Sequence, residues 1–142
     1  MKRLLTGLLV LAAIGVLVIV VFSLLGGDDD GEPDIREVQS DERGLSVKEA
    51  IGRAPEDTFA VRGFAYDDGA FIQLCNGLTD DSPPRCVGPS VLLLDLDLQR
   101  LPLERGEIDG RRVLYTEEPV LLGGNLDGTQ LRVVDVLIDA EG

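Results

Sequence analysis

The sequence of 142 residues predicts a mainly β fold, a small five-stranded β-barrel with a short N-terminal helix, preceded by one transmembrane helix. Three observations lead to this prediction. An uncharged apolar run lies near the N-terminus, short stretches after residue 58 alternate apolar and polar side chains, and most of these stretches are joined without a helical pattern. Short strands without intervening helices are typical of small barrels.

Residues 4–25 form the uncharged run, which consists almost entirely of Leu, Val, Ile and Ala. A helix of this length measures about 33 Å, enough to cross a hydrocarbon core of about 30 Å. The alternative is a cleaved signal peptide, but its apolar core spans about 7–15 residues and ends at small residues. Because Leu24 and Leu25 end this run, we expect an uncleaved signal anchor whose partner is the lipid bilayer.

The charges on either side of the run predict its orientation. Lys2 and Arg3 precede it, and Asp28-Asp29-Asp30 follows it. Positive residues stay on the cytoplasmic side of a membrane. We therefore expect residues 1–3 in the cytoplasm, a single pass through the cell membrane, and an extracellular C-terminal domain.

Residues 26–44 contain eight acidic side chains and only two aliphatic ones. Such a segment cannot bury enough apolar surface to offset the entropy that ordering costs. The composition predicts a disordered, self-repelling tether over 26–44 and a folded domain over 45–142.

The folded domain opens with Ser46-Val47-Lys48-Glu49, the pattern of a helix capping box. The helix is expected to run to about Arg53, because Pro55 prevents its continuation. Asp67-Asp68-Gly69 and Leu126-Asp127-Gly128 predict hairpin turns, and Gly123-Gly124 predicts a bulge. The alternating stretches predict strands at 58–66, 70–75, 90–98, 119–125 and 129–137, with a further short extended piece at 112–116.

A family resemblance rests on two segments. Ser46-Val47-Lys48-Glu49-Ala50-Ile51, followed by Phe59-Ala60-Val61-Arg62-Gly63, resembles the start of extracytoplasmic bacterial OB-fold proteins, where a short helix precedes a first strand reading Val-x-Gly. The stretch 74–88, with two Cys and Pro83-Pro84, is similar to one in uncharacterised single-pass membrane proteins of high-GC Gram-positive bacteria. The resemblance implies an OB-like β-barrel over most of residues 46–138.

The sequence departs from the OB pattern in two places. The helix usual between the third and fourth OB strands has only residues 101–110 available, interrupted by Pro102 and two Gly. The surface that binds oligonucleotides in other OB proteins is acidic here, since the chain has 26 acidic and 13 basic residues. The resemblance therefore implies a fold and not a ligand.

Cys75 and Cys86 are the two cysteines of the chain. In the oxidising compartment outside the membrane, two cysteines of one domain most simply form a disulfide. The alternative is a redox-active pair, which usually needs a close C-x-x-C spacing and a neighbour that lowers the thiol pKa. Arg85 is the one basic neighbour, opposed by nearby acids, so we favour a structural disulfide.

The disulfide would clamp a loop of fourteen residues, 76–89, and long loops in compact domains are often binding elements. The simpler interpretation, which the sequence favours over a recognition role, is that the bridge only staples a long crossover in a small barrel. The candidate binding residues provide two carboxylates, a stiff dipeptide and a guanidinium fork. They are Asp80, Asp81, Pro83, Pro84 and Arg85.

The chain has no His, which excludes most hydrolase triads and zinc sites, and its acidic balance argues against nucleic acid as a partner. No cofactor is expected. Asp95 and Asp97 would lie about 6.8 Å apart on one strand face and are weak candidates for a cation site. In so acidic a chain, such carboxylate pairs are better explained as a solvated face.

These observations predict a membrane-anchored, non-enzymatic extracytoplasmic binding module. Its partner is expected to be an envelope protein, a peptide or a polysaccharide. Two alternatives remain open at this point. The clustered Asp residues suggest a calcium-dependent adhesion or structural module, and the Asp and Glu pairs suggest a carboxylate-based glycan hydrolase.

Overall fold

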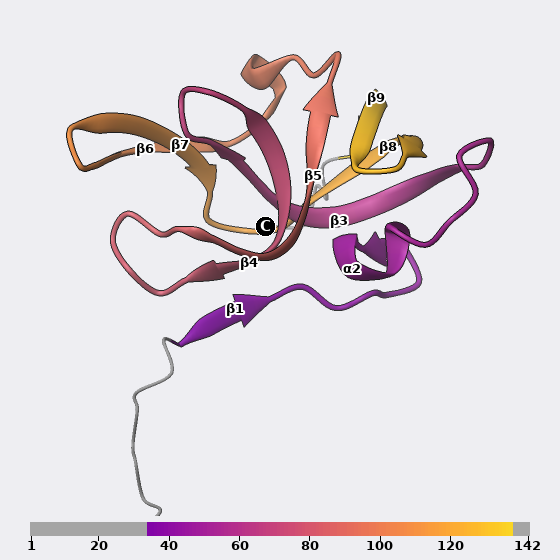
Figure 1. The fold of residues 1–142 in the computed structure, drawn as a ribbon, viewed down its shortest axis with the longest axis horizontal. Coiled ribbons are helices and arrows are strands. Elements are labelled where there is room, and N and C mark those ends of the chain that lie inside the picture. Colours follow the sequence, from indigo (N-terminus) through magenta and orange to yellow (C-terminus); the bar gives the residue numbers. More distant parts are fainter. Residues whose placement is uncertain (1–33, 138–142) are drawn as a thin grey trace, which may run out of the picture. The chain divides into compact units, whose positions relative to one another are not determined.

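The computed structural model describes residues 34–137, which form a mainly β fold with one short α-helix (Figure 1). The described residues belong to one compact unit, 33–142. The predicted cytoplasmic end, the transmembrane anchor at 4–25 and the first part of the tether lie outside the described residues. Within residues 34–137, no helix is long and apolar enough to span a bilayer.

The described elements follow one another in this order along the chain. They are β1 (Ile35–Glu37), β2 (Leu45–Ser46), α2 (Val47–Ala50), β3 (Thr58–Asp67), β4 (Ile72–Thr79), β5 (Cys86–Leu94), the 3-10 helix η1 (Leu98–Arg100), β6 (Leu103–Ile108), β7 (Arg111–Thr116), β8 (Val120–Asp127) and β9 (Gln130–Leu137).

Five of the strands pair in a ring. β3 pairs with β4, β4 with β5, and β5 with β9, while β9 pairs with β8 and β8 returns to β3. All of these pairs are antiparallel except β5–β9, which is parallel and spans only Leu92–Leu94 and Gln130–Arg132. The β6–β7 hairpin joins the ring through two residues of β3, Tyr66 and Asp67, and lies outside the ring (Figure 1).

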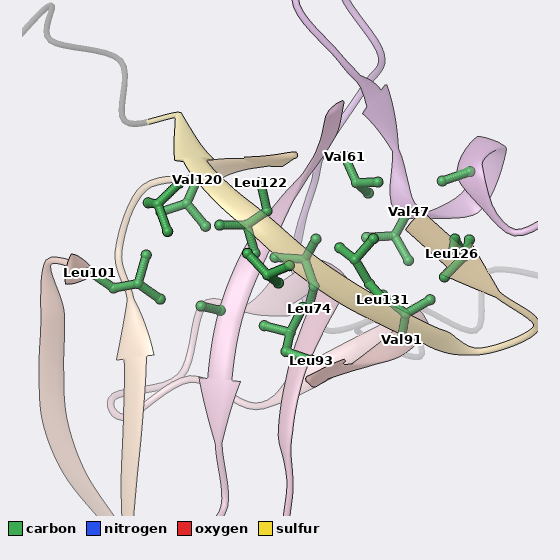
Figure 2. Packing of buried hydrophobic residues seen from close by; sticks show 14 residues of the cluster. Val47, Val61, Leu74, Val91, Leu93, Leu101, Val120, Leu122, Leu126 and Leu131 are labelled. Carbon is green, nitrogen blue, oxygen red and sulfur yellow. The ribbon is translucent and has the colours of Figure 1, made fainter. Parts of the chain in front are cut away.

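The ring encloses a core whose buried members are all Val, Ala or Leu, and we call it the inner core (Figure 2). A Cβ at Gly63 would lie 2.7 Å from Leu74 Cγ and 2.8 Å from the Cys75 carbonyl oxygen, so glycine is required where β3 approaches β4. Fully burying one such side chain contributes about 1.5–3 kcal/mol. Six of the largest fully buried side chains of the inner core are Leu74, Leu122, Leu131, Val47, Val61 and Val91.

A second cluster, the outer core, packs on the opposite face of β3 and β4. The members that β3 contributes are Phe64 and Tyr66. They point to the face opposite Val61 and Ala65, as the alternation of side chains along a strand predicts. The hairpin strand β7 covers them with Val113. The buried members of the outer core are Val38, Phe64, Tyr66, Cys75, Leu78 and Val113. Both faces of the β3–β4 pair are therefore covered.

The helix α2 is shorter than predicted, since it ends at Ala50 and not near Arg53. Ser46 Oγ accepts from Glu49 N at 3.3 Å, as the capping box requires. The second half of the box is replaced, because Ser46 N donates to Ser40 Oγ at 2.6 Å. Gly52 directly follows the last turn and disfavours a longer helix.

The structure differs from the predicted tether at residues 35–44, which belong to the folded unit. β1 pairs with β4 in antiparallel register, and Val38 N donates to Asn76 O at 2.8 Å. The Val38 side chain is only 7% exposed, in the outer core. The acidic composition does not predict this ordered segment, because it does not show that the free edge of β4 is available. That edge provides backbone hydrogen bonds that an acidic segment can use while its carboxylates remain in water.

Asp41 stabilises the return of this segment toward β2. Its side chain accepts from the backbone N–H groups of Arg43 and Gly44, and it forms ion pairs with Arg43 and Arg62. The Arg43 N–H, foremost among these contacts, holds the pKa of Asp41 below its ordinary value. Charge is thus used here to fix a turn.

The segment 101–110, considered above for the OB helix, instead forms β6 and the turn that leads to β7. The strand predicted at 90–98 begins earlier, at Cys86, and ends at Leu94, where Asp95 adopts a positive φ of 60°. The predicted bulge is confirmed, since the β8–β9 register shifts between Gly123 and Gly124.

Candidate functional site

The predicted disulfide is present and joins Cys75 of β4 to Cys86 of β5, with a Cα–Cα distance of 5.7 Å. Cys75 is fully buried in the outer core, and Cys86 packs against that core. The predicted loop 76–89 is corrected, because 76–79 and 86–89 are strand residues and only 80–85 connect them. The bridge therefore cross-links two paired strands near their hairpin end.

The hairpin end 80–85 contains all five candidate binding residues. Thr79 Oγ1 accepts from Arg85 N at 2.9 Å and donates to Asp81 Oδ2 at 3.0 Å. Asp80 forms an ion pair with Arg36 at 3.1 Å. Both carboxylates thus have close partners within the protein, whereas the Arg85 side chain is more than half exposed and makes only a long contact with Asp109.

The two prolines fix this hairpin end against its surroundings. Pro84 is buried, and Pro83 lies against Gly106 of β6. A Cβ at Gly106 would stand 2.4 Å from Pro83 Cβ, so the contact requires glycine. The β4–β5 and β6–β7 hairpins are therefore in direct contact, although they belong to different parts of the chain.

A cleft of about 600 Å³ lies where three hairpin turns come together, those of β3–β4, β4–β5 and β6–β7. Figure 1 shows these turns extending from the same side of the ring. Of the five candidate binding residues that the sequence predicts, Arg85 lines this cleft. The other lining residues are Tyr66, Asp68, Ala70, Gln73, Cys86, Ile108, Asp109, Arg111 and Val113.

Two arginines and two aspartates give the cleft its electrostatic character. Arg85 Nη2 lies 3.8 Å from Asp109 Oδ2, and both side chains are exposed, so the contact is weak. Asp68 Oδ1 accepts from the backbone N–H groups of Ala70 and Phe71 at 2.8 and 2.9 Å. The Phe71 N–H, followed by that of Ala70, holds the pKa of Asp68 below its ordinary value, and Arg111 adds to this effect.

Tyr66 lies at the junction of the cleft and the outer core. Its side chain is 6% exposed. Burial, followed by the charge of Asp68, raises the pKa of its hydroxyl. Tyr66 also lines the cleft, and a tyrosine hydroxyl is a hydrogen-bond donor.

The structure does not place Asp95 and Asp97 on a common strand face, because β5 ends at Leu94. Asp95 forms an ion pair with Arg132 at 3.6 Å, and Asp97 caps η1 by accepting from Gln99 N at 3.0 Å. In the part of the chain that the structure describes, no group of three or more His, Cys, Asp or Glu side chains could hold a metal ion.

Sequence reasoning identified Arg85 but missed the rest of the cleft, including Tyr66, Asp109 and Arg111. The available signal was Asp109-Gly110, a dipeptide typical of tight hairpin turns. Read as a turn, it predicts that β6 and β7 form a hairpin, and it places Arg111 at the start of the returning strand.

Comparison of the chain with protein-family models, with curated proteins and with solved structures finds no match.

Proposed function

We propose that the chain is a membrane-anchored, extracytoplasmic binding module with an OB-like β-barrel, and that its ligand occupies the cleft between the three hairpin turns. The barrel is supported by the ring of five paired strands. Its parallel β5–β9 pair joins strands that are not neighbours in the sequence, as expected of a five-stranded Greek-key barrel. The β6–β7 hairpin would stand where other OB proteins have a helix.

The observation that carries the proposal is the cleft itself. Segments far apart in the sequence, from β3 to β7, build one concavity of about 600 Å³, the size of an ordinary ligand pocket. The disulfide and the Pro83–Gly106 contact fix two of its walls. A preformed site of this kind binds without a large ordering cost.

A binding role accounts for the cleft better than a catalytic one. A carboxylate pair in a glycosidase needs one member whose pKa is raised so that it can donate a proton. Asp68 has the opposite property, a lowered pKa, and its Oδ1 already accepts two backbone hydrogen bonds. Arginine and a protonated tyrosine are recognition groups, which hold a ligand by donating hydrogen bonds.

The anchor and the topology rest on the sequence of residues 1–30. A protease added to intact cells tests them with tags at both ends of the full chain. We expect the C-terminal tag to be degraded and the N-terminal tag to be protected. The opposite pattern would show that the topology is wrong. Extraction of the chain by alkaline carbonate would show that it is not anchored in the membrane.

Photo-crosslinking in living cells tests the cleft as the binding site. A photoreactive residue at Ala70, which lines the cleft, is expected to give an adduct that an identical residue at Glu56 does not give. The adduct should disappear when Arg85→Gln and Arg111→Gln are combined. It should persist in the matched control Arg100→Gln with Arg132→Gln, whose arginines pair with Asp135 and Asp95. An adduct that survives the cleft double variant would refute the proposal.

A further inference from the structure

Arginines gather around the cleft in a chain whose formal net charge is −13. Arg85 and Arg111 both line it, and Arg111 also borders a smaller hollow together with Arg112. Among residues 34–137, no carboxylate lies within 4.0 Å of the Arg111 guanidinium. With two acids for every base in the chain, a cleft arginine without such a partner has a hydrogen-bonding fork ready for a ligand.

The neighbouring acids do not neutralise these arginines firmly. Asp68 Oδ1 accepts from two backbone amides of its turn, so this oxygen is already engaged. Asp109 lies 3.8 Å from Arg85 with a side chain that is 85% exposed, an arrangement that contributes little to stability. A carboxylate therefore already stands beside Arg85, held loosely enough for a carboxylate from another molecule to replace it.

The cleft also has an apolar wall. Half-buried Ile108 lines it from the β6–β7 hairpin, whereas the lining residues Val113 and Tyr66 belong to the outer core and are 3% and 6% exposed, so they add little open surface. Phe71, beside the cleft residue Ala70, is 61% exposed on a turn that Asp68 fixes through two hydrogen bonds. An exposed aromatic side chain on a fixed turn is typical of an anchor for a protein or peptide partner.

We propose that the cleft binds an acidic peptide segment, with a Glu or Asp side chain held between Arg85 and Arg111 and a neighbouring apolar side chain packed on Ile108. The inference rests on the proposed binding function and specifies its ligand class. A carboxylate matches a guanidinium fork with a single negative charge. A phosphate dianion would meet stronger repulsion from Asp68, Asp109 and the acidic domain, and a hydroxylated sugar acid would leave the apolar wall poorly covered.

Fluorescence anisotropy tests this proposal with the purified full-length chain in detergent. The probe is a labelled peptide with the core Leu-Glu-Leu, and its matched control has the core Leu-Gln-Leu. We expect the Glu peptide to bind at least about tenfold more tightly, because only its carboxylate can accept charge-assisted bonds. Arg85→Gln with Arg111→Gln should abolish the difference, whereas Arg100→Gln with Arg132→Gln should retain it.

Three competitors, acetate, inorganic phosphate and an oligogalacturonate, test which chemical group supplies the negative charge. Acetate is expected to displace the Glu peptide more effectively than inorganic phosphate at equal concentration, and the reverse order would overturn the carboxylate assignment. An oligogalacturonate that binds more tightly than the Glu peptide would overturn the peptide assignment. Equal affinity for the Glu and Gln peptides would overturn both.

The two proposals can fail separately. If the Ala70 crosslink in cells depends on Arg85 and Arg111 while the Glu peptide does not bind, the cleft is a binding site and the ligand class is wrong. If the crosslink is insensitive to both arginines, the binding function itself fails at this site.

Discussion

The inner and outer cores share strands β3 and β4 but differ in composition and in role. The buried inner core contains only Val, Ala and Leu, whereas the outer core contains Phe64, Tyr66 and a half-cystine, with Cys86 and Tyr115 packed against it. The inner core fills a ring of five paired strands. The outer core attaches the β6–β7 hairpin and the segment around Val38 to the outside of that ring, and the cleft lies at its margin. One core therefore specifies the fold, and the other specifies the candidate site.

The largest effect expected from this comparison is that of Leu74→Ala in the inner core. Leu74 is fully buried, and such a substitution costs about 3–5 kcal/mol because it leaves a cavity. Val113→Ala in the outer core removes less volume from a hairpin that pairs with β3 at only two residues, so we expect a loss of about 1–2 kcal/mol. Urea denaturation measures both. Equal losses would contradict the ranking of the two cores.

The disulfide tests how far the outer core depends on a covalent link. Closing the loop between Cys75 and Cys86 is worth about 3 kcal/mol in the chain-entropy estimate. We expect dithiothreitol to lower the melting temperature of the native chain, since reduction frees β4 from β5 near the hairpin end. The double variant Cys75→Ala, Cys86→Ala should melt at a low temperature that dithiothreitol does not change. A native chain insensitive to reduction would show that strand pairing alone fixes this end.

Gly106→Ala tests the contact between the two hairpins. The new Cβ would stand 2.4 Å from Pro83 Cβ, and relieving such a clash typically costs about 1–3 kcal/mol. We also expect weaker binding of the Leu-Glu-Leu peptide, because the cleft walls separate. Gly52→Ala is the matched control, since nothing lies within 4 Å of its added Cβ. Unchanged peptide affinity in Gly106→Ala would mean that the contact does not shape the cleft.

The smallest effect concerns Asp68, whose pKa is held below its ordinary value of 3.8 by the N–H groups of Phe71 and Ala70. A lowered folded-state pKa contributes stability above pH 3.8, and this stability is lost as the pH falls through the folded-state pKa. Asp68→Ala should therefore lower the free energy of unfolding by about 1 kcal/mol at pH 7, and by less at pH 2–3.

Thermal unfolding at several pH values measures this dependence. The control Glu56→Ala should show no such difference, because Glu56 is exposed in the turn between α2 and β3. If Asp68→Ala is equally destabilising at pH 3 and pH 7, the carboxylate charge does not stabilise the turn.

The sequence predicts how the residues of β3 divide between the two cores and is much less informative about the segments that cover the outer core. Alternation along 58–66 separates Val61 and Ala65 from Phe64 and Tyr66, and the structure assigns the two sets to different cores. The covering pieces, 35–38 and 103–108, contain few apolar residues and gain their order from pairing with other strands. No local pattern reveals the pairing of 35–38, whereas the pairing of 103–108 is indicated only by the turn dipeptide Asp109-Gly110 that follows it.

The candidate site can likewise be predicted only in part from the sequence. Arg85 follows from its place between the two half-cystines, but Asp109 and Arg111 reach the cleft through the β6–β7 hairpin and Tyr66 reaches it from β3. Their meeting depends on one glycine, Gly106, which allows Pro83 to approach. A contact between residues that lie more than 20 positions apart has no signature in a single sequence.

The short parallel pair between β5 and β9 also determines when the domain can be completed during synthesis. A nascent chain that has reached β8 already contains both cysteines and the whole outer core, but Leu92–Leu94 still lack their partner Gln130–Arg132. Until β9 is synthesised, β5 and β8 each present a free edge. A chain stopped before residue 130 would therefore retain the cleft residues and have two strands open to aggregation.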